Sequence, residues 1–184
     1  EIKRLQMELG ITSIYVTHDQ VEAMTMADRV AVMKDGKLHA FAPPDELYDK
    51  PRTLFIGGFV GNPPMNFVDV EVVAENGEYY AQREGLKLRL PPELGGKVAG
   101  RSQIIMGIRP EDVTVGDDGV PGEVYVVEPL GREDLVDVHI GEASVRVLTD
   151  PAVKVRIGDT VRLRFKMDKV QFFDAATEES LLWT

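Results

Sequence analysis

The hydrophobic pattern changes at residues 57–64, and this change limits the fold more than any other feature of the sequence. Beyond this Gly- and Pro-rich stretch, apolar residues recur at every second position, and in residues 161–167 they alternate with Arg and Lys. A period of two is typical of strands with one buried and one solvated face. Turn dipeptides such as Asn76-Gly77 and Gly95-Gly96 separate these runs. We therefore expect residues 61–184 to form a small closed or sandwiched β-structure.

Helices and strands mix before the change. Apolar residues in 2–9 lie in a polar stretch that ends at Gly10, which predicts a helix with a glycine stop. The run Ile14-Tyr15-Val16 has the composition of a short buried strand. A hairpin turn at Asp35-Gly36 and a helix start at Pro43-Pro44-Asp45 follow. Because one parallel strand cannot form a sheet, we expect the rest of this α/β domain to lie outside the sequence.

Composition and charge exclude several classes of protein. No run approaches the roughly 18 apolar residues of a membrane-spanning helix, and the absence of cysteine excludes disulfides and thiolate metal sites. The net charge is −10; residues 1–60 carry seven Lys and Arg against nine Asp and Glu, whereas residues 61–184 carry fourteen against twenty-two. An acidic surface repels phosphate backbones, so we do not expect nucleic acid as a partner.

The segment Thr17-His18-Asp19-Gln20 has the most chemical promise. His18 follows the predicted buried strand and precedes a helix, and open α/β sheets place ligand groups at this carboxyl edge. A neutral imidazole there can accept a hydrogen bond from an attacking water or contact a terminal phosphate. The alternative is a histidine that only caps or packs at the strand end. The helix start is marked twice, since Thr17 with Gln20 and Asp19 with Glu22 both have the capping-box spacing.

Residues 15–24 closely resemble the switch-histidine segment of ABC transporter ATPases. The resemblance continues in order through Ala27-Asp28-Arg29, Asp35-Gly36-Lys37, Pro44-Asp45-Glu46-Leu47-Tyr48, Phe59-Val60-Gly61, Met65-Asn66-Phe67, Gly107-Ile108-Arg109-Pro110-Glu111 and Val127-Glu128-Pro129-Leu130-Gly131. Together these segments are similar to the maltose and multiple-sugar importer ATPases, which append a regulatory domain of OB-type barrels. The resemblance implies that residues 1–60 are the C-terminal end of the ABC ATPase domain, an α/β fragment. It implies that residues 61–184 are an all-β, OB-fold (TOBE-like) regulatory domain.

The resemblance also assigns one site residue. It implies that His18 is the switch histidine, which is catalytic and contacts the γ-phosphate of ATP in the closed dimer of the full-length subunit. No residue is assigned to a metal. The phosphate loop, signature motif, Q-loop and catalytic Glu of the family are missing, and no Gly-x-x-x-x-Gly-Lys-Ser/Thr occurs in the sequence. We therefore expect ATP and Mg²⁺ as cofactors of the full-length protein, and neither cofactor nor ATPase activity for these 184 residues alone.

The partners and location are implied in the same way. The resemblance implies a homodimer held by the β-domains, transmembrane permease subunits, and a regulatory protein as a further candidate partner. It implies a cytoplasmic protein, peripheral on the inner face of the cell membrane. The identity of the sugar rests with other subunits and is not encoded in these residues.

Other polar residues have structural interpretations that we favour. Arg109 and Glu111 flank Pro110 at a strand end, where their charges pair or cap the turn. Asn66 is expected to bond backbone across the interdomain junction, or to lie at an interface. The acid pairs Asp117-Asp118 and Glu133-Asp134 are sequence neighbours, so their side chains diverge instead of flanking one bond as glycosidase carboxylates do. His39 and His139 are predicted strand residues without a metal partner, and Phe172-Phe173 with Trp183 are predicted to form core or barrel closure rather than a sugar-stacking platform.

Two alternative functions stay open. The first is a stand-alone OB-type module that senses or binds a ligand and has no link to ATP, because such barrels commonly bind oligosaccharides or small anions. It leaves the incomplete α/β part unexplained. The second is a nucleic-acid-binding OB protein, which the acidic charge and the lack of interleaved basic and aromatic residues disfavour.

Overall fold

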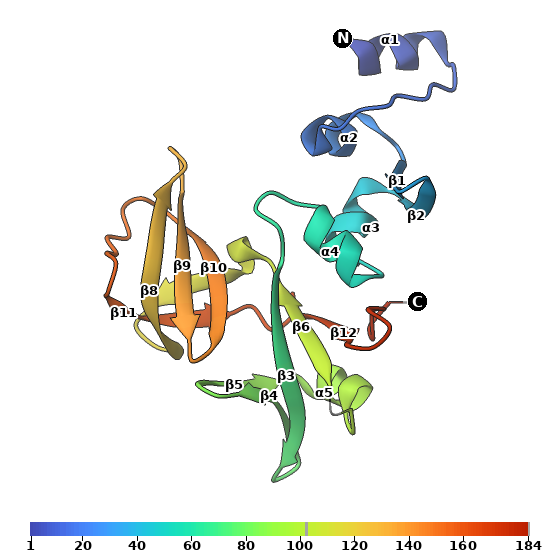
Figure 1. Cartoon of the computed structure of the whole chain (residues 1–184). Coiled ribbons are helices and arrows are strands. Elements are labelled where there is room, and N and C mark those ends of the chain that lie inside the picture. The colour runs from blue at the N-terminus through green and yellow to red at the C-terminus, as the bar shows by residue number, and fades with distance from the viewer. Residues whose placement is uncertain (102, 184) are drawn as a thin grey trace. The chain divides into compact units, whose positions relative to one another are not determined.

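The computed structural model describes residues 1–101 and 103–183. The chain divides into two compact units, residues 1–50 and residues 51–184, whose elements are drawn in Figure 1. A short α/β part precedes a β-rich domain, as the sequence predicts. The predicted boundary at residue 60 stays a prediction, because the second compact unit already begins at Pro51.

The first unit contains three short helices and one hairpin among its described residues. Its elements are α1 (Ile2–Leu9), α2 (Gln20–Met26), β1 (Val30–Lys34), β2 (Lys37–Ala42) and α3 (Pro44–Asp49). Gly10 ends α1 in the left-handed region with φ 62°, and its N–H donates to the carbonyl of Gln6. The hairpin turn has φ 51° at Asp35 and 74° at Gly36, which is the backbone that favours an Asp-Gly pair. The predicted helix stop and hairpin are confirmed.

The predicted buried strand at Ile14-Tyr15-Val16 is wrong for this structure. These residues form neither helix nor strand, and Ile14 and Val16 are 94% and 90% exposed. A strand needs a neighbouring strand to take up its backbone N–H and C=O groups, and the described part of the first unit offers only the hairpin β1-β2, whose strands pair with each other. Residues 14–16 therefore have the composition of a strand but no partner strand among the described residues of the first unit.

Helix α4 (Leu54–Phe59) opens the second unit and was not predicted, because its two glycines are typical of a linker. Thr53 caps the helix by accepting a hydrogen bond from the N–H of Ile56 at 3.3 Å. A Cβ added at Gly57 would lie 3.2 Å from Sδ of Met65, and one at Gly58 would lie 3.1 Å from the ring of Phe67. The glycines thus let the helix approach the side chains that lead into the first sheet strand.

Two five-stranded antiparallel sheets build the rest of the second unit (Figure 1). The first has the order β12-β6-β3-β4-β5, and the second has the order β10-β9-β8-β11-β7. The strands of the first are β3 (Asn66–Glu75), β4 (Glu78–Arg83), β5 (Leu86–Leu90), β6 (Ile104–Ile108) and β12 (Gln171–Asp174). Those of the second are β7 (Val113–Gly116), β8 (Val120–Pro129), β9 (Asp134–Ile140), β10 (Ala143–Thr149) and β11 (Thr160–Phe165). A 3₁₀ turn, η1 (Pro110–Asp112), connects β6 to β7.

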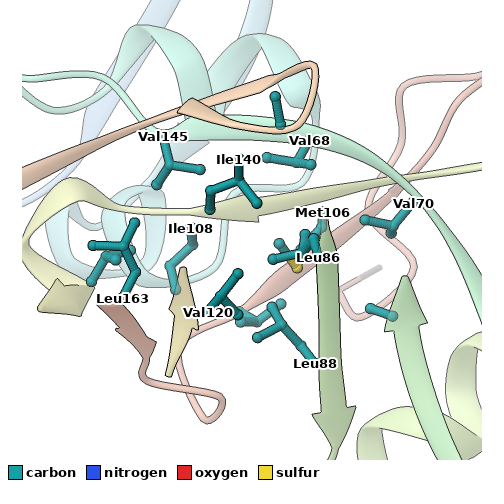
Figure 2. Packing of buried hydrophobic residues seen from close by; sticks show 14 of the residues in the cluster. Val68, Val70, Leu86, Leu88, Met106, Ile108, Val120, Ile140, Val145 and Leu163 are labelled. Atoms are coloured by element: carbon teal, nitrogen blue, oxygen red, sulfur yellow. The ribbon is translucent and has the colours of Figure 1, made fainter. Parts of the chain in front are cut away.

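One hydrophobic core serves both sheets. In β11, Val161 and Leu163 are buried while Arg162 and Arg164 are exposed, which confirms the predicted alternation. Figure 2 shows Met106 and Ile108 of the first sheet near Ile140 and Leu163 of the second. Burying each such side chain contributes roughly 1.5–3 kcal/mol. The two sheets are therefore one folding unit rather than two independent domains.

The predicted turn at Gly95-Gly96 is wrong, because both residues lie inside α5 (Pro92–Val98). A Cβ at Gly95 would lie 2.4–2.5 Å from the side chain of Tyr79 in β4, whereas one at Gly96 would meet nothing within 4 Å. Gly95 is thus required by the close approach of α5 to the first sheet and not by a turn.

The first sheet is completed by the end of the chain. Strand β12 pairs antiparallel with β6 after the whole second sheet has intervened in the sequence. Just beyond it, the N–H of Ser180 donates to the carbonyl of Arg52, and the N–H of Leu54 donates to that of Glu178. The first and last segments of the second unit are therefore joined by backbone hydrogen bonds.

Candidate functional site

The turn that carries His18 is organised by the start of α2. Asp19 is the N-cap residue, and its Oδ1 accepts hydrogen bonds from the N–H groups of Val21 at 2.8 Å and Glu22 at 3.1 Å. These bonds satisfy two of the backbone donors that a helix start leaves without intrahelical partners. Of the two capping residues that the sequence allows, the structure therefore uses Asp19.

Thr17 and Glu22 form a second link across the same turn. The hydroxyl of Thr17 donates to Oε2 of Glu22 at 2.7 Å, and its Oγ1 accepts from the N–H of Asp19 at 2.9 Å. In an ordinary capping box the N3 carboxylate accepts directly from the N-cap N–H. Here the Thr17 hydroxyl links them: it accepts from the N–H of Asp19 and donates to the carboxylate of Glu22. The residues before and after His18 are both attached to the first turn of α2.

Tyr15 joins this cluster from the irregular segment. Its hydroxyl donates to Oε2 of Glu22 at 3.2 Å. The hydrogen bond to Glu22, followed by the negative charge of that carboxylate, raises the pKa of Tyr15 above its ordinary value. Glu22 thus accepts two hydrogen bonds, as an ionised carboxylate does.

The side chain of His18 is exposed. No hydrogen bond within residues 1–101 and 103–183 engages its imidazole, so both ring nitrogens are available to a partner. An imidazole in this state can accept a proton from water or donate to a phosphate oxygen. The same described residues contain no group of three His, Asp or Glu side chains that could hold a metal ion.

Arg109 is a buried structural residue. It is 4% exposed, and its guanidinium donates to the carbonyl of Val60 at 2.7 Å. A structural role for Arg109 is supported, but its partner here is the backbone at the end of α4. The predicted pairing with Glu111 or capping of the turn stays a prediction. Glu111 lies in the adjoining turn η1.

Asn66 bonds backbone as expected, although it does so between the two sheets and not at the interdomain junction. Its Nδ2 donates to the carbonyl of Arg146 at 2.8 Å, and its Oδ1 accepts from the N–H of Arg146 at 2.8 Å. Asn66 begins β3 and is 4% exposed, while Arg146 lies in the edge strand β10. The amide therefore takes the place of a neighbouring strand at this one residue.

The remaining sequence candidates do not converge on one site. Asp118 pairs with Arg164, and Asp117 is exposed; Glu133 is exposed and Asp134 begins β9. His39 lies in β2, and His139 lies in β9, where its ring stacks on Tyr125 with centroids 4.4 Å apart. Phe172 and Phe173 are fully buried, which confirms the core interpretation, and Nε1 of Trp183 donates to Oε1 of Gln171 at 2.6 Å.

Sequence reasoning missed the Thr17–Glu22 link and the Tyr125–His139 stack. The first was hidden because the capping-box pattern pairs Thr17 with Gln20 and Asp19 with Glu22, and does not pair Thr17 with Glu22. The second depends on an irregularity of register between Val124 and Val126 in β8. Such bulges redirect a side chain and have no sequence signature here.

Among the described residues, no helix is both long enough and apolar enough to cross a membrane.

Two family models match the β-rich part of the chain. Residues 61–113 match the MalK OB fold domain, and residues 106–173 match the TOBE domain. The two matches meet at β6 and η1, where the chain passes from the first sheet to the second.

Relatives extend the similarity to the whole chain. It is 43% identical, over 98% of its length, to the trehalose/maltose import ATP-binding protein MalK of Thermococcus litoralis, of which it covers 51%. It is 41% identical to the sulfoquinovosyl glycerol transport ATP-binding protein SmoE of Agrobacterium fabrum, over 98% of this chain and 51% of that protein. It is 39% identical to the xylose/arabinose import ATP-binding protein XacK of Haloferax volcanii, over 98% of this chain and 49% of that protein. The chain spans about half the length of these curated relatives.

The fold and the two domain matches define a chain whose larger part is an OB/TOBE-type regulatory β-domain. The similarity that continues through the α/β part identifies its wider context. Over 98% of its length the chain is similar to MalK-type ATP-binding subunits of ABC sugar importers, and it corresponds to their C-terminal part.

Proposed function

We propose that the complete subunit hydrolyses ATP with Mg²⁺, and that hydrolysis drives uptake of a sugar or sugar-like solute through permease subunits. The observation that carries this proposal is the similarity over nearly the whole chain to ATP-binding proteins named for the import of trehalose and maltose, xylose and arabinose, or sulfoquinovosyl glycerol. The variety of these solutes supports a common ATP-driven role with substrate choice made elsewhere.

In this proposal residues 1–60 are the C-terminal end of the ATPase domain, and His18 is the switch histidine. Its exposed imidazole, presented on a hydrogen-bonded turn, fits contact with a terminal phosphate oxygen or with the attacking water. The chain itself has no phosphate loop, and its described residues form no metal cluster. ATP and Mg²⁺ would therefore be held mainly by the part of the complete subunit that lies outside these 184 residues.

The β-domain, residues 61–184, would keep two copies of the subunit paired while the ATPase domains open and close. Its fourteen basic against twenty-two acidic residues suit a protein partner better than a nucleic acid. The domain also offers a surface to a regulatory protein. The complete subunit would work in the cytoplasm, bound to the inner face of the membrane through its permease.

The test is ATP hydrolysis by the complete subunit with and without its permease, compared with the His18→Ala variant. We expect the variant still to bind MgATP and to lose at least about 10²-fold in kcat, because a positioned acid–base group contributes 10²–10⁴-fold. Wild-type turnover in His18→Ala would remove His18 from the mechanism. Sedimentation of the 184-residue chain tests pairing, and a strict monomer at high concentration would contradict the dimer-holding role of the β-domain.

A further inference from the structure

The backbone at His18 is not fixed by packing within the described part of the first unit. Ile14 and Val16, just before it, are 94% and 90% exposed, and α2 has no buried residue. Fixing the backbone of one residue costs about 1–2 kcal/mol in conformational entropy, so a turn without packing needs other constraints. The hydrogen bonds of Thr17, Asp19 and Glu22 are the constraints that the structure supplies.

These bonds attach both neighbours of His18 to one element. Thr17 reaches Glu22 through its hydroxyl at 2.7 Å and holds the N–H of Asp19 through the same oxygen at 2.9 Å. Asp19 holds the N–H groups of Val21 and Glu22. The chain enters and leaves His18 through residues that are tied to the first turn of α2, and Glu22 is half-buried against them.

We infer that Glu22, acting through the Thr17 hydroxyl, is a positioning residue that holds the backbone of His18 in the orientation its chemistry requires. This inference rests on the proposed function of His18. Glu22 does not touch the reacting atoms in this role. Its effect comes from geometry, and a misplacement of about 1 Å can cost about 10²-fold in rate.

A simpler role for Glu22 is to place a negative charge in the first turn of α2, where it favours the helix. Two pairs of substitutions, one at Glu22 and one at Thr17, separate the roles. Glu22→Gln removes the charge but keeps an oxygen that can accept from Thr17, whereas Glu22→Leu removes both. Thr17→Val removes the linking hydroxyl without touching the charge, and Thr17→Ser restores it.

The first experiment measures the backbone N–H order parameter of His18 by NMR in the 184-residue chain, and it does not depend on ATPase activity. We expect a fall from near 0.85 to below about 0.6 in Thr17→Val and Glu22→Leu, with Glu22→Gln and Thr17→Ser close to wild type. The matched control is Thr25→Val on the same helix, because the Thr25 hydroxyl donates only to the backbone carbonyls of Val21 at 2.6 Å and Glu22 at 3.4 Å and takes no part in the Thr17–Glu22 side-chain link. An unchanged order parameter in Thr17→Val, or equal effects of Glu22→Gln and Glu22→Leu, would overturn the inference.

The second experiment measures kcat and KM for MgATP in the complete subunit. We expect Thr17→Val and Glu22→Leu to lower kcat by about 10–100-fold with KM unchanged, and Thr17→Ser to recover the rate. Full kcat in Thr17→Val and Glu22→Leu would overturn the positioning role. An inactive wild type, or a fully active His18→Ala, would instead refute the proposed function, while the order parameter still decides whether Glu22 holds the turn.

Discussion

Replacing Asn66 by Ala tests how the two sheets of the second unit are held together. The substitution removes both 2.8 Å hydrogen bonds to Arg146 and leaves the N–H and C=O of that residue without their partner at the edge of β10. Each bond contributes about 1 kcal/mol net, and an unsatisfied buried group costs about 1–3 kcal/mol. Because Arg146 is only half-buried, water recovers part of the loss, and we expect Asn66→Ala to lower the free energy of unfolding by about 2–4 kcal/mol.

The measurement is urea and thermal unfolding of the 184-residue chain, followed by a signal from the β-domain. For a domain of this size the expected loss corresponds to a fall in Tm of roughly 6–15 °C, with the urea m-value unchanged. Asn66→Asp keeps the acceptor for the N–H of Arg146 but sets a carboxylate oxygen against its carbonyl, so we expect at least as large a loss at pH 7.

The matched control is Ser144→Ala, because Ser144 is exposed on the same strand β10. Such a surface change is expected to stay within about 0.5 kcal/mol of wild type. If Asn66→Ala also stays within that range, or if Asn66→Asp is as stable as wild type, the amide does not stabilise the contact between the sheets and the reasoning fails.

Three further predictions concern the same chain. Gly95→Ala should destabilise it by about 1–3 kcal/mol because its Cβ meets Tyr79, whereas Gly96→Ala one position on should raise stability by up to about 1 kcal/mol; equal effects in denaturant unfolding would contradict the close-approach argument. Backbone N–H donors from the turn that follows lower the pKa of Asp174, so its contribution to stability is present at neutral pH and is lost as the pH falls from about 5 towards the lowered pKa; Asp174→Asn should flatten this part of the stability–pH curve, and parallel curves would refute the assignment. The 184-residue chain should show no ATPase activity above background, and hydrolysis that disappears in His18→Ala would contradict this expectation.

Local signals predicted those elements that depend on local chemistry. Backbone preference predicts the glycine stop at Gly10 and the hairpin turn at Asp35-Gly36, and the structure contains both. Strand period predicts the alternation of residues 161–167, and β11 shows it. The capping of α2 by Asp19 belongs to the same group.

The errors arose where a distant part of the chain decides the outcome. Gly57-Gly58 and Gly95-Gly96 are typical of linkers and turns, yet both pairs lie in helices. In each helix the first glycine leaves room for a side chain from elsewhere in the chain, Met65 or Tyr79. Ile14-Tyr15-Val16 failed for the opposite reason, since its composition fits a strand but no described strand lies beside it.

The candidate site could be predicted in position but not in detail. The sequence placed His18 before a capped helix, and the structure agrees. The link through Thr17 to Glu22 depends on which hydroxyl rotamer and which carboxylate oxygen meet, and sequence spacing does not determine these.

The late pairing of β12 has a consequence for synthesis on the ribosome. The first sheet contains strands from residue 66 onward, but its edge at β6 stays open until residues 171–174 have been made. The nascent β-domain therefore exposes the unpaired edge of β6 while residues 109–170 are being made, and such an edge is the kind of surface at which chains associate wrongly. A stop codon between residues 165 and 171 would leave all five strands of the second sheet intact and still deprive the first sheet of its closing strand.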